Sequence, residues 1–252
     1  MIKISAPKSH PRFLSLYYRD LLAEGVRIGI TSLQGLTAHG RGETFDYKKK
    51  KKTLLFAKSS IKATAALLLL ARYPVLSVNG NTAILVPKEF IKLSNLVGAQ
   101  IEVNIFHASK ERERKIKAHL EKFGAGRVLL PGKARISGIE SNRWMISSIG
   151  QKKADVVFVP LEDGDRTQAL TAMGKKVITV DLNPLSRTAQ TATITIVDNI
   201  VRVMPLLIKK ADDLKNSPPE KLLQIVERYD NKKILSEALN FINRRLHILA
   251  RR

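Results

Sequence analysis

The residues best suited to chemistry gather in short polar strings, and the most informative string runs from Asp181 to Thr188. It follows the apolar residues 177–180, which are typical of a fully buried β-strand. In an open parallel sheet, ligands bind outside the carboxyl ends of the strands. The string therefore predicts a nucleotide site, with carboxylate, amide and guanidinium groups delivered where a strand ends.

A second string, residues 38–43, places Arg41 between two glycines. Glycine allows the backbone to approach a ligand, and a guanidinium can grip a phosphate at two points. His39 in the same string could bond a phosphate, act as a base, or satisfy a backbone carbonyl, which is the commoner role of an isolated histidine. We expect residues 35–47 to form a glycine-rich loop that presents Arg41 to a ligand.

A third string, Asn79-Gly80-Asn81, directly follows the apolar residues 75–78. Its glycine frees the turn, and its two amides offer donors and acceptors to a polar ligand. The string matches neither the G-x-G-x-x-G dinucleotide fingerprint nor the P-loop. Two interpretations stay open: a plain turn between a strand and a helix, or a substrate-binding role for these three residues.

Three carboxylates occur within four residues, at Glu162, Asp163 and Asp165, again after an apolar run. Such a cluster is unusual in so basic a chain. The acids could cap the helix that follows, because negative charge suits the positive end of a helix. They could also face a cleft, and we predict that at least one of Asp163 and Asp165 does so.

The elements that must position these strings alternate between strands and helices. Apolar runs predict the strands, and amphipathic segments between most of them predict the helices. This alternation indicates an α/β fold, with a parallel sheet covered by helices on both faces. The predicted strands span residues 75–78, 101–105, 128–130, 156–159, 177–180 and 194–197, and the helices between them include residues 88–97 and 109–123.

Helical segments flank the predicted sheet. Ser9-His10-Pro11 predicts the start of an N-terminal helix and Gly25 its end. Apolar residues then recur at helical spacing over residues 53–72. After the prolines at 218 and 219, a C-terminal helical section carries an apolar stripe that either packs on the domain or meets a partner subunit. The stripe consists of Leu235, Leu239, Ile242, Leu246 and Leu249.

Composition limits the possible functions. The 252 residues are enough for a substantial core, and the absence of cysteine excludes disulfides, thiolate catalysis and cysteine-based zinc sites. The net charge of +22 has three possible explanations: binding of nucleic acid, binding of phosphorylated substrates, or a surface adapted to salt or heat. The lysine run, residues 48–52, is expected to be a solvated loop, with attraction of a polyanion as the alternative.

The chain shows no membrane or export signal. Its longest apolar run, residues 65–71, is far shorter than the ~20 residues that cross a bilayer. The N-terminus lacks the apolar segment of a secretory signal. We therefore predict a cytoplasmic protein.

Taken together, the strings resemble the archaeal phosphopantothenate synthetases, also called 4-phosphopantoate–β-alanine ligases. The resemblance covers most of the first 205 residues in the expected order, and it departs from the family pattern at the lysine run. The matching blocks are His10-Pro11-Arg12 with Ser15-Leu16 and Arg19, and residues 35–43, 77–82, 155–167, 181–189 and 197–201.

The resemblance implies a homodimeric enzyme of coenzyme A synthesis. Its Rossmann-like α/β ligase domain would span residues 1–215, and residues 216–252 would form a C-terminal helical extension. The implied reaction joins 4-phosphopantoate to β-alanine and converts ATP to AMP and pyrophosphate through an acyl-adenylate. ATP contacts are implied at Arg19, Arg41, Asp181, Leu182, Asn183, Arg187, Thr188, Asn199 and Ile200.

The chemistry of the first step suits the arginines of this set. A carboxylate must approach a polyphosphate, and Arg19, Arg41 and Arg187 can offset the repulsion between these anions. We expect Mg²⁺ to be bound mainly by phosphate and water, and we predict no protein metal site.

The second step requires a held and deprotonated amine. Asp163, Asp165 and Glu43 are candidates to hold the ammonium group of β-alanine, and His39 is a candidate base. The alternative function is a basic α/β module that binds RNA, with a non-catalytic nucleotide site. No RNA-recognition or helix-turn-helix signature supports that alternative, so we disfavour nucleic acid and membranes as partners.

Overall fold

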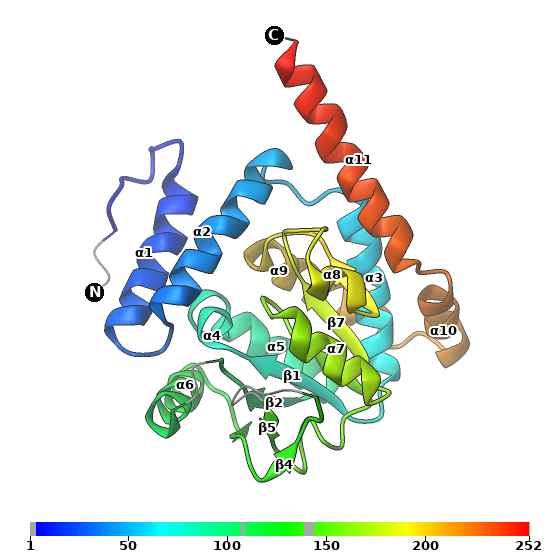
Figure 1. The fold of residues 1–252 in the computed structure, drawn as a ribbon. Helices are drawn as coiled ribbons and strands as arrows, with labels where there is room; N and C mark the ends of the chain where they lie inside the picture. Colours follow the sequence, from blue (N-terminus) through cyan, green and yellow to red (C-terminus); the bar gives the residue numbers. More distant parts are fainter. Residues whose placement is uncertain (1–3, 107–108, 139–143, 252) are drawn as a thin grey trace.

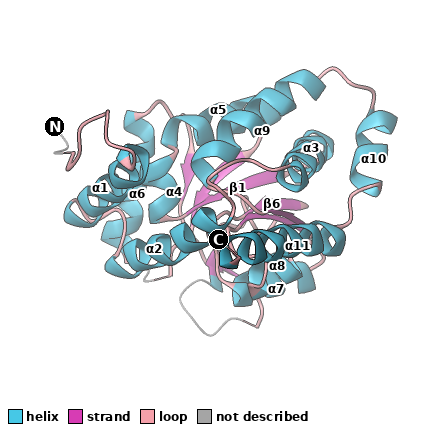
Figure 2. Cartoon of the chain, turned by 90° about the horizontal axis from the view of Figure 1, so that it is seen from above, coloured by secondary structure: helices cyan, strands magenta, loops and turns pink. Residues whose placement is uncertain are grey.

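A computed structural model describes residues 4–106, 109–138 and 144–251. Over these ranges the chain forms a six-stranded sheet with helices on both faces (Figures 1 and 2). Its strands are β1 (Pro74–Val78), β2 (Gln100–Val103), β3 (Val128–Leu129), β6 (Val156–Phe158), β7 (Lys176–Val180) and β8 (Ile194–Ile196). The helices are α1 (Phe13–Arg27), α2 (Leu33–Lys48), α3 (Leu55–Leu70), α4 (Gly80–Leu85), α5 (Pro87–Val97), α6 (Lys110–Lys122), α7 (Gly164–Ala172), α8 (Arg187–Thr191), α9 (Ile200–Leu214), α10 (Pro219–Glu227) and α11 (Asn231–Ala250).

The six strands are all parallel and lie in the order β3-β2-β1-β6-β7-β8. The chain builds outward from β1 to β3 and then restarts on the other side of β1 with β6. This is the strand order of a Rossmann-like fold, in which ligands bind at the carboxyl ends where the order reverses. The predicted fold class and all six predicted strands are confirmed, apart from shifts at strand ends.

The sheet separates a large hydrophobic core from a small one. Phe158 of β6 packs in the large core, where its ring centre lies 5.8 Å from that of Phe90 of α5. The neighbouring Val157 packs in the small core with residues of α7. Figure 2 shows α3, α5 and α9 on one side of the sheet and α7 and α8 on the other. Covered on both faces, the strands hold their carboxyl ends in fixed positions.

A second, two-stranded sheet is not predicted by the sequence. Antiparallel strands β4 (Ala134–Arg135) and β5 (Met145–Ile146) place Ile136 and Ile146 in the small core. Strands this short carry no periodic signal that a sequence pattern could detect.

The expected glycine-rich loop over residues 35–47 is wrong, because these residues belong to helix α2. The Ser32 hydroxyl caps the helix by accepting the Gly35 N–H at 3.1 Å. Two glycines lie where α2 comes close to other segments. A Cβ added at Gly35 would lie 2.6 Å from Asn81 Oδ1, and one at Gly42 would lie 3.2 Å from Leu182 Cδ1. The glycines thus allow a helix, rather than a loop, to approach the ends of the strands.

The N-terminal helix starts and ends later than expected. It begins at Phe13, after Arg12, which makes no side-chain cap, and continues past Gly25 to Arg27. Gly25 lies within the helix, where the lack of a side chain gives room to Ile84 of α4. An added Cβ would lie 2.8 Å from Ile84 Cγ1.

The lysine run is not a plain solvated loop. Lys50 and Lys52 are exposed, but Lys49 is completely buried. Lys51 forms an ion pair with Glu43 at 3.2 Å. The solvated-loop prediction is therefore wrong for Lys49, whose Nζ donates to the distant Val197 carbonyl at 2.9 Å.

The C-terminal helices pack on the sheet domain and then extend beyond it. Helix α10 lies against α3, and the first half of α11 contacts α8 and β8. Figure 1 shows the end of α11 projecting from the rest of the chain. The apolar stripe accordingly divides: Leu235 and Ile242 are buried, whereas Leu246 and Leu249 are exposed. The domain boundary at residue 216 stays a prediction. Among the described residues, no helix is both long enough and apolar enough to span a membrane.

Candidate active site

Two adjoining cavities lie at the carboxyl ends of the central strands. The larger has a volume of about 740 Å³ and the smaller about 260 Å³. They are formed by α2 and by the polar segments that follow β1, β6, β7 and β8. Six residues line both cavities: Ala38, Arg41, Asn81, Phe106, Leu161 and Asp163. The cavities thus join beside the point where the strand order reverses.

The predicted site residues meet in these cavities, with two exceptions. The larger cavity is lined by His39, Arg41, Asp163, Asp165, Asp181, Leu182, Asn183, Arg187, Thr188, Asn199 and Ile200, and the smaller by Asn79, Gly80 and Asn81. The first exception is Arg19, which lies on α1 with a half-exposed guanidinium that bonds Ser5 and Asp20. Glu43 also lies outside both linings and pairs with Lys51.

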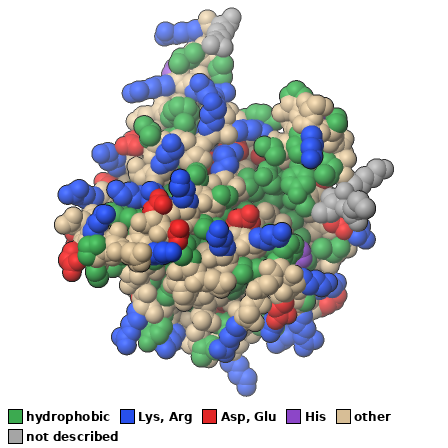
Figure 3. All heavy atoms as spheres, turned by 180° about the vertical axis from the view of Figure 1, so that it is seen from behind, with side chains coloured by type: hydrophobic (Ala, Val, Ile, Leu, Met, Phe, Trp, Pro, Cys, Tyr) green, Lys and Arg blue, Asp and Glu red, His purple; other side chains and the backbone are tan. Residues whose placement is uncertain are grey.

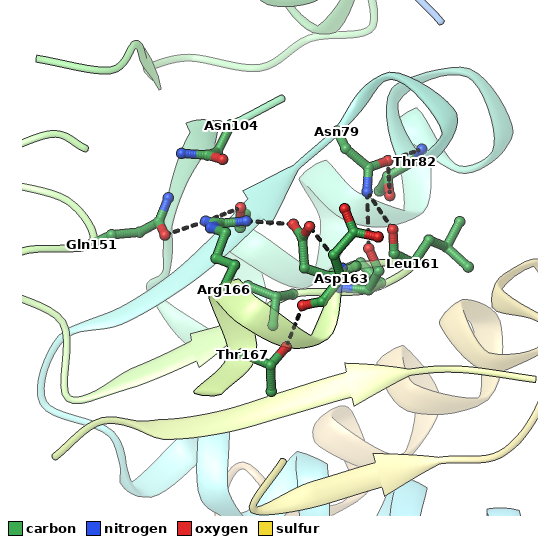
Figure 4. Close-up of polar contacts among 12 residues, drawn as sticks. Asn79, Thr82, Asn104, Gln151, Leu161, Asp163, Arg166 and Thr167 are labelled. Atoms are coloured by element: carbon green, nitrogen blue, oxygen red, sulfur yellow. Dashed lines mark hydrogen bonds and ion pairs between the residues drawn. The ribbon is translucent and has the colours of Figure 1, made fainter. Parts of the chain in front are cut away.

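The turn after β6 has an unusual backbone conformation at Leu161. Its φ of +55° lies in a region that residues other than glycine rarely adopt. The Asn79 amide donates to the carbonyls of Pro160 and Leu161, both at 3.0 Å (Figure 4). The Asn79 oxygen accepts the backbone N–H and the hydroxyl of Thr82. Asn79 therefore joins the ends of β1 and β6 and holds the turn in place.

A buried ion pair holds the same turn from within α7. Arg166 is completely buried, and its guanidinium lies 2.5 Å from the Glu162 carboxylate. It also donates to the Ser77 hydroxyl at 2.9 Å and to the Gln151 side-chain oxygen (Figure 4). Glu162, the first acid of the predicted cluster, therefore balances a buried cation.

The other two acids of the cluster differ in their surroundings. Asp165 lines the larger cavity, and its carboxylate accepts the Arg166 backbone N–H at 2.8 Å near the start of α7. Asp163 is the N-cap residue, but its side chain makes no capping hydrogen bond. It is exposed and lines both cavities. The capping interpretation therefore suits Asp165, whereas Asp163 puts a carboxylate where the cavities join.

His39 presents a neutral imidazole to the larger cavity. Burial lowers the pKa of this ring, against the charges of Glu43 and Asp46, which raise it. Its Nε2 atom is buried and has no hydrogen-bond partner within the described part of the chain. A neutral ring can accept a proton, although the burial that lowers its pKa makes it a weaker base than free imidazole.

The turn after β7 is shaped by Asp181. Its carboxylate accepts the Asn183 backbone N–H at 2.9 Å and the Ser186 hydroxyl. Burial raises the pKa of Asp181, and these hydrogen bonds and the charge of Lys49 lower it. Asp181 thus orders the loop through which Leu182 and Asn183 line the cavity.

The turns after β6 and β7 are in close contact through Arg187. A Cβ added at Gly164 would lie 2.4 Å from Arg187 Nε, so only glycine leaves room for the arginine there. The hydroxyl of Thr188 donates to the Glu162 carbonyl at 2.8 Å. Arg187 therefore has a defined place at the exposed side of the larger cavity.

The turn after β8 supplies an apolar surface and an amide. Ile200 is buried at the start of α9, and the Asn199 oxygen accepts the Val201 N–H at 3.3 Å. The Asn199 amide donates to Asp46 at 3.3 Å. This turn is thus held to α2 as well as to its own helix.

One cation in the smaller cavity is missed by the sequence reasoning. Arg112 of α6 lines that cavity with Thr31 and Ser32, and its Nε donates to the Ile30 carbonyl at 3.0 Å. Arg112 lies in a highly charged helix, where no spacing distinguishes it from its neighbours. Among the described residues, no group of three or more His, Cys, Asp or Glu is placed to hold a metal ion.

Comparisons with known proteins identify the family of this chain. Residues 56–245 match the sequence model of a family described as phosphopantothenate/pantothenate synthetase. The chain is 51% identical over 250 residues to the 4-phosphopantoate–β-alanine ligase of Thermococcus kodakarensis, an alignment that covers 98% of this chain and 95% of that protein. It is 47% identical over 244 residues to the ligase of the same name from Methanosarcina mazei, covering 97% and 96%. This chain belongs to the phosphopantothenate/pantothenate synthetase family.

Proposed function

We propose that this protein is a carbon–nitrogen ligase that joins 4-phosphopantoate to β-alanine. The product, 4′-phosphopantothenate, serves coenzyme A synthesis, and ATP is converted to AMP and pyrophosphate. The observation that carries the proposal is the junction of the two cavities at Arg41 and Asp163. ATP would occupy the larger cavity and the organic acid the smaller one. The names of the relatives support the ligation of the same two substrates.

The reaction needs activation of the acid, because a carboxylate carbon is a poor electrophile. An oxygen of the phosphopantoate carboxylate attacks the α-phosphorus of ATP, and pyrophosphate leaves. The β-alanine amine then attacks the acyl carbon of this adenylate, and AMP leaves as the amide forms. Both attacks bring charged groups together, so they depend on fixed charges that offset repulsion in the transition state.

Arginines are suitably placed for the first attack. Arg41 lines both cavities, so one guanidinium can contact the phosphates of ATP and the incoming acid. Arg187 would bind the phosphate chain from the other side of the larger cavity. In the smaller cavity Arg112, Thr31 and Asn81 offer a cation and polar groups to the phosphate of phosphopantoate. Arginine stays charged at all relevant pH values, so these contacts do not depend on protonation.

The second attack needs a held ammonium group and a base. The position of Asp163 between the cavities supports a role in holding the ammonium group of β-alanine. The neutral ring of His39 would then take the proton that the amine must lose. Asp165 and Glu43 are weaker candidates, because Asp165 lines only the larger cavity and Glu43 lines neither.

We infer that Mg²⁺ enters as part of the MgATP substrate. Held mainly by phosphates and water, the ion needs at most one or two protein carboxylates, and Asp163 and Asp165 line the larger cavity. The homodimer stays a prediction that rests on the family, and the cytoplasmic location stays a prediction that rests on the sequence. An ATP contact by Arg19 would need movement of α1 or a second copy of the chain, because the guanidinium lies apart from the cavity.

The alternative of an RNA-binding module has little support on one face of the molecule. On the face drawn in Figure 3, Lys and Arg side chains are scattered among neutral ones rather than gathered along a track. A single assay separates the two functions: AMP release from ATP with a panel of acids and amines. The proposal predicts release that depends on both 4-phosphopantoate and β-alanine. RNA binding without AMP release would contradict the proposal. AMP release with a different acid and amine would show that the enzyme joins other substrates.

A further inference from the structure

Lys49, the buried member of the lysine run, reaches a turn of the larger cavity from α2. Its Nζ donates to the carbonyl of Val197 at 2.9 Å, and no part of the residue is exposed. Val197 directly follows β8, and the chain then turns into Asn199 and Ile200, both lining residues. The lysine therefore fixes the backbone directly before a segment of the cavity, although it does not line the cavity itself.

The side chain of Lys49 belongs to a buried cluster of balanced charge. Arg202 of α9 lies 2.5 Å from Asp46 and also pairs with Asp198. The Thr53 hydroxyl donates to Asp198 at 2.5 Å. Two cations thus face two carboxylates, Asp46 from α2 and Asp198 from the segment after β8. Loss of the lysine charge would leave one uncompensated negative charge behind the cavity.

This charge matters because the cluster lies next to the proposed ATP site. Asp181, which lines the larger cavity, is a further carboxylate whose charge acts on Lys49. An excess of negative charge behind the cavity would repel a polyphosphate bound in it, because charges in a partly buried site are weakly screened. Burial lowers the pKa of Lys49 to about 8, and Asp198, Asp46 and Asp181 oppose this effect.

We propose that Lys49 is a positioning residue for ATP, which fixes the turn after β8 and balances the carboxylates behind the larger cavity. The inference rests on the proposed function, since it requires ATP in that cavity. A purely structural role would be to attach the end of α2 to the sheet. If Lys49 had only that role, its substitution would lower the stability of the protein without a matching loss of affinity for ATP.

The test compares Lys49→Met with Lys52→Met, an exposed lysine of the same run. MgATP binding is measured by calorimetry, and KM and kcat are measured with all substrates. We expect Lys49→Met to raise the Kd for MgATP about 10-fold, because the turn after β8 loses its anchor and the carboxylates behind the cavity lose a compensating charge. The KM for phosphopantoate should stay within about twofold. Lys52→Met should leave both constants unchanged. Lys49→Arg, which keeps a charge, should restore most of the affinity.

A pH series keeps the inference testable if Lys49→Met does not fold. The wild-type Kd for MgATP should rise from about pH 7 to about pH 9.5, as the amine with a pKa of about 8 loses its proton. In Lys49→Arg this rise should disappear. Unchanged affinity in Lys49→Met, or a wild-type Kd that is flat over this range, would overturn the inference. Wild-type protein that binds no MgATP would instead overturn the proposed function.

Discussion

Cations at the rim of the cavities and cations behind them differ in what surrounds them. Arg41 and Arg187 are exposed and line the cavities. Arg166 and Lys49 are completely buried and bond protein groups that hold the cavity turns. In a chain with a net charge of +22, exposure and partners therefore separate the two roles better than residue type does. Rim cations are placed to meet ligand charge, whereas buried cations fix the loops that shape the site.

The largest effect should come from a buried cation. We predict that Arg166→Met lowers the free energy of unfolding by about 3–5 kcal/mol, because it leaves the buried Glu162 carboxylate uncompensated. Denaturant unfolding measures this change. Arg114→Met, at an exposed arginine of α6, should change stability by no more than about 0.5 kcal/mol. A cost below about 1 kcal/mol for Arg166→Met would remove the distinction between buried and rim cations.

The next largest effect should separate the two chemical steps. We predict that Asp163→Ala slows amide formation about 100-fold, because the amine of β-alanine loses its anchor, and slows adenylate formation much less. Rapid-quench measurement of each half-reaction checks this. Asp213→Ala, on the surface of α9, serves as the control. Equal losses in both half-reactions would count against the role of Asp163.

A rim cation should affect catalysis without affecting folding. For Arg41→Ala we expect kcat/KM to fall about 30-fold for both ATP and phosphopantoate, since the guanidinium lines both cavities and a contact to a charged group contributes roughly 1.5–3 kcal/mol. The unfolding midpoint should stay unchanged. An effect on only one substrate would show that the cavities do not share this arginine in function.

The smallest effect should come from a change that moves a rim cation indirectly. Gly164→Ala places a methyl group where the Arg187 side chain now lies, so Arg187 must shift. We predict a rise of about fivefold in the KM for ATP, roughly 1 kcal/mol. Gly126→Ala is the matched control, because a Cβ there would meet nothing within 4 Å. An unchanged KM would mean that the position of Arg187 is not critical for ATP.

Much of the site could be predicted because it depends on short-range patterns. Apolar runs mark the strands, and polar strings such as Asp181–Thr188 come directly after them, so the rule for parallel sheets places them together. Helix α2 could not be predicted in the same way. Its three glycines disfavour a helix, and the contacts that explain Gly35 and Gly42, with Asn81 and Leu182, come from distant parts of the sequence.

The roles of single cations were the least predictable part. Lys49 is buried because Asp198 and Arg202 complete its surroundings, and they lie about 150 residues away in the chain. Arg112 meets the smaller cavity through the packing of α6, which a run of charged residues does not reveal. Sequence patterns locate the ends of strands, but they do not tell which of many cations those ends will meet.

The central claim is that ATP and the organic acid react with each other where the two cavities join. The most direct measurement is isotope exchange between pyrophosphate and ATP in the presence of 4-phosphopantoate and the absence of β-alanine. We predict exchange under these conditions, because the adenylate forms before the amine is needed. Exchange that requires β-alanine, or release of ADP and phosphate in place of AMP and pyrophosphate, would contradict the claim.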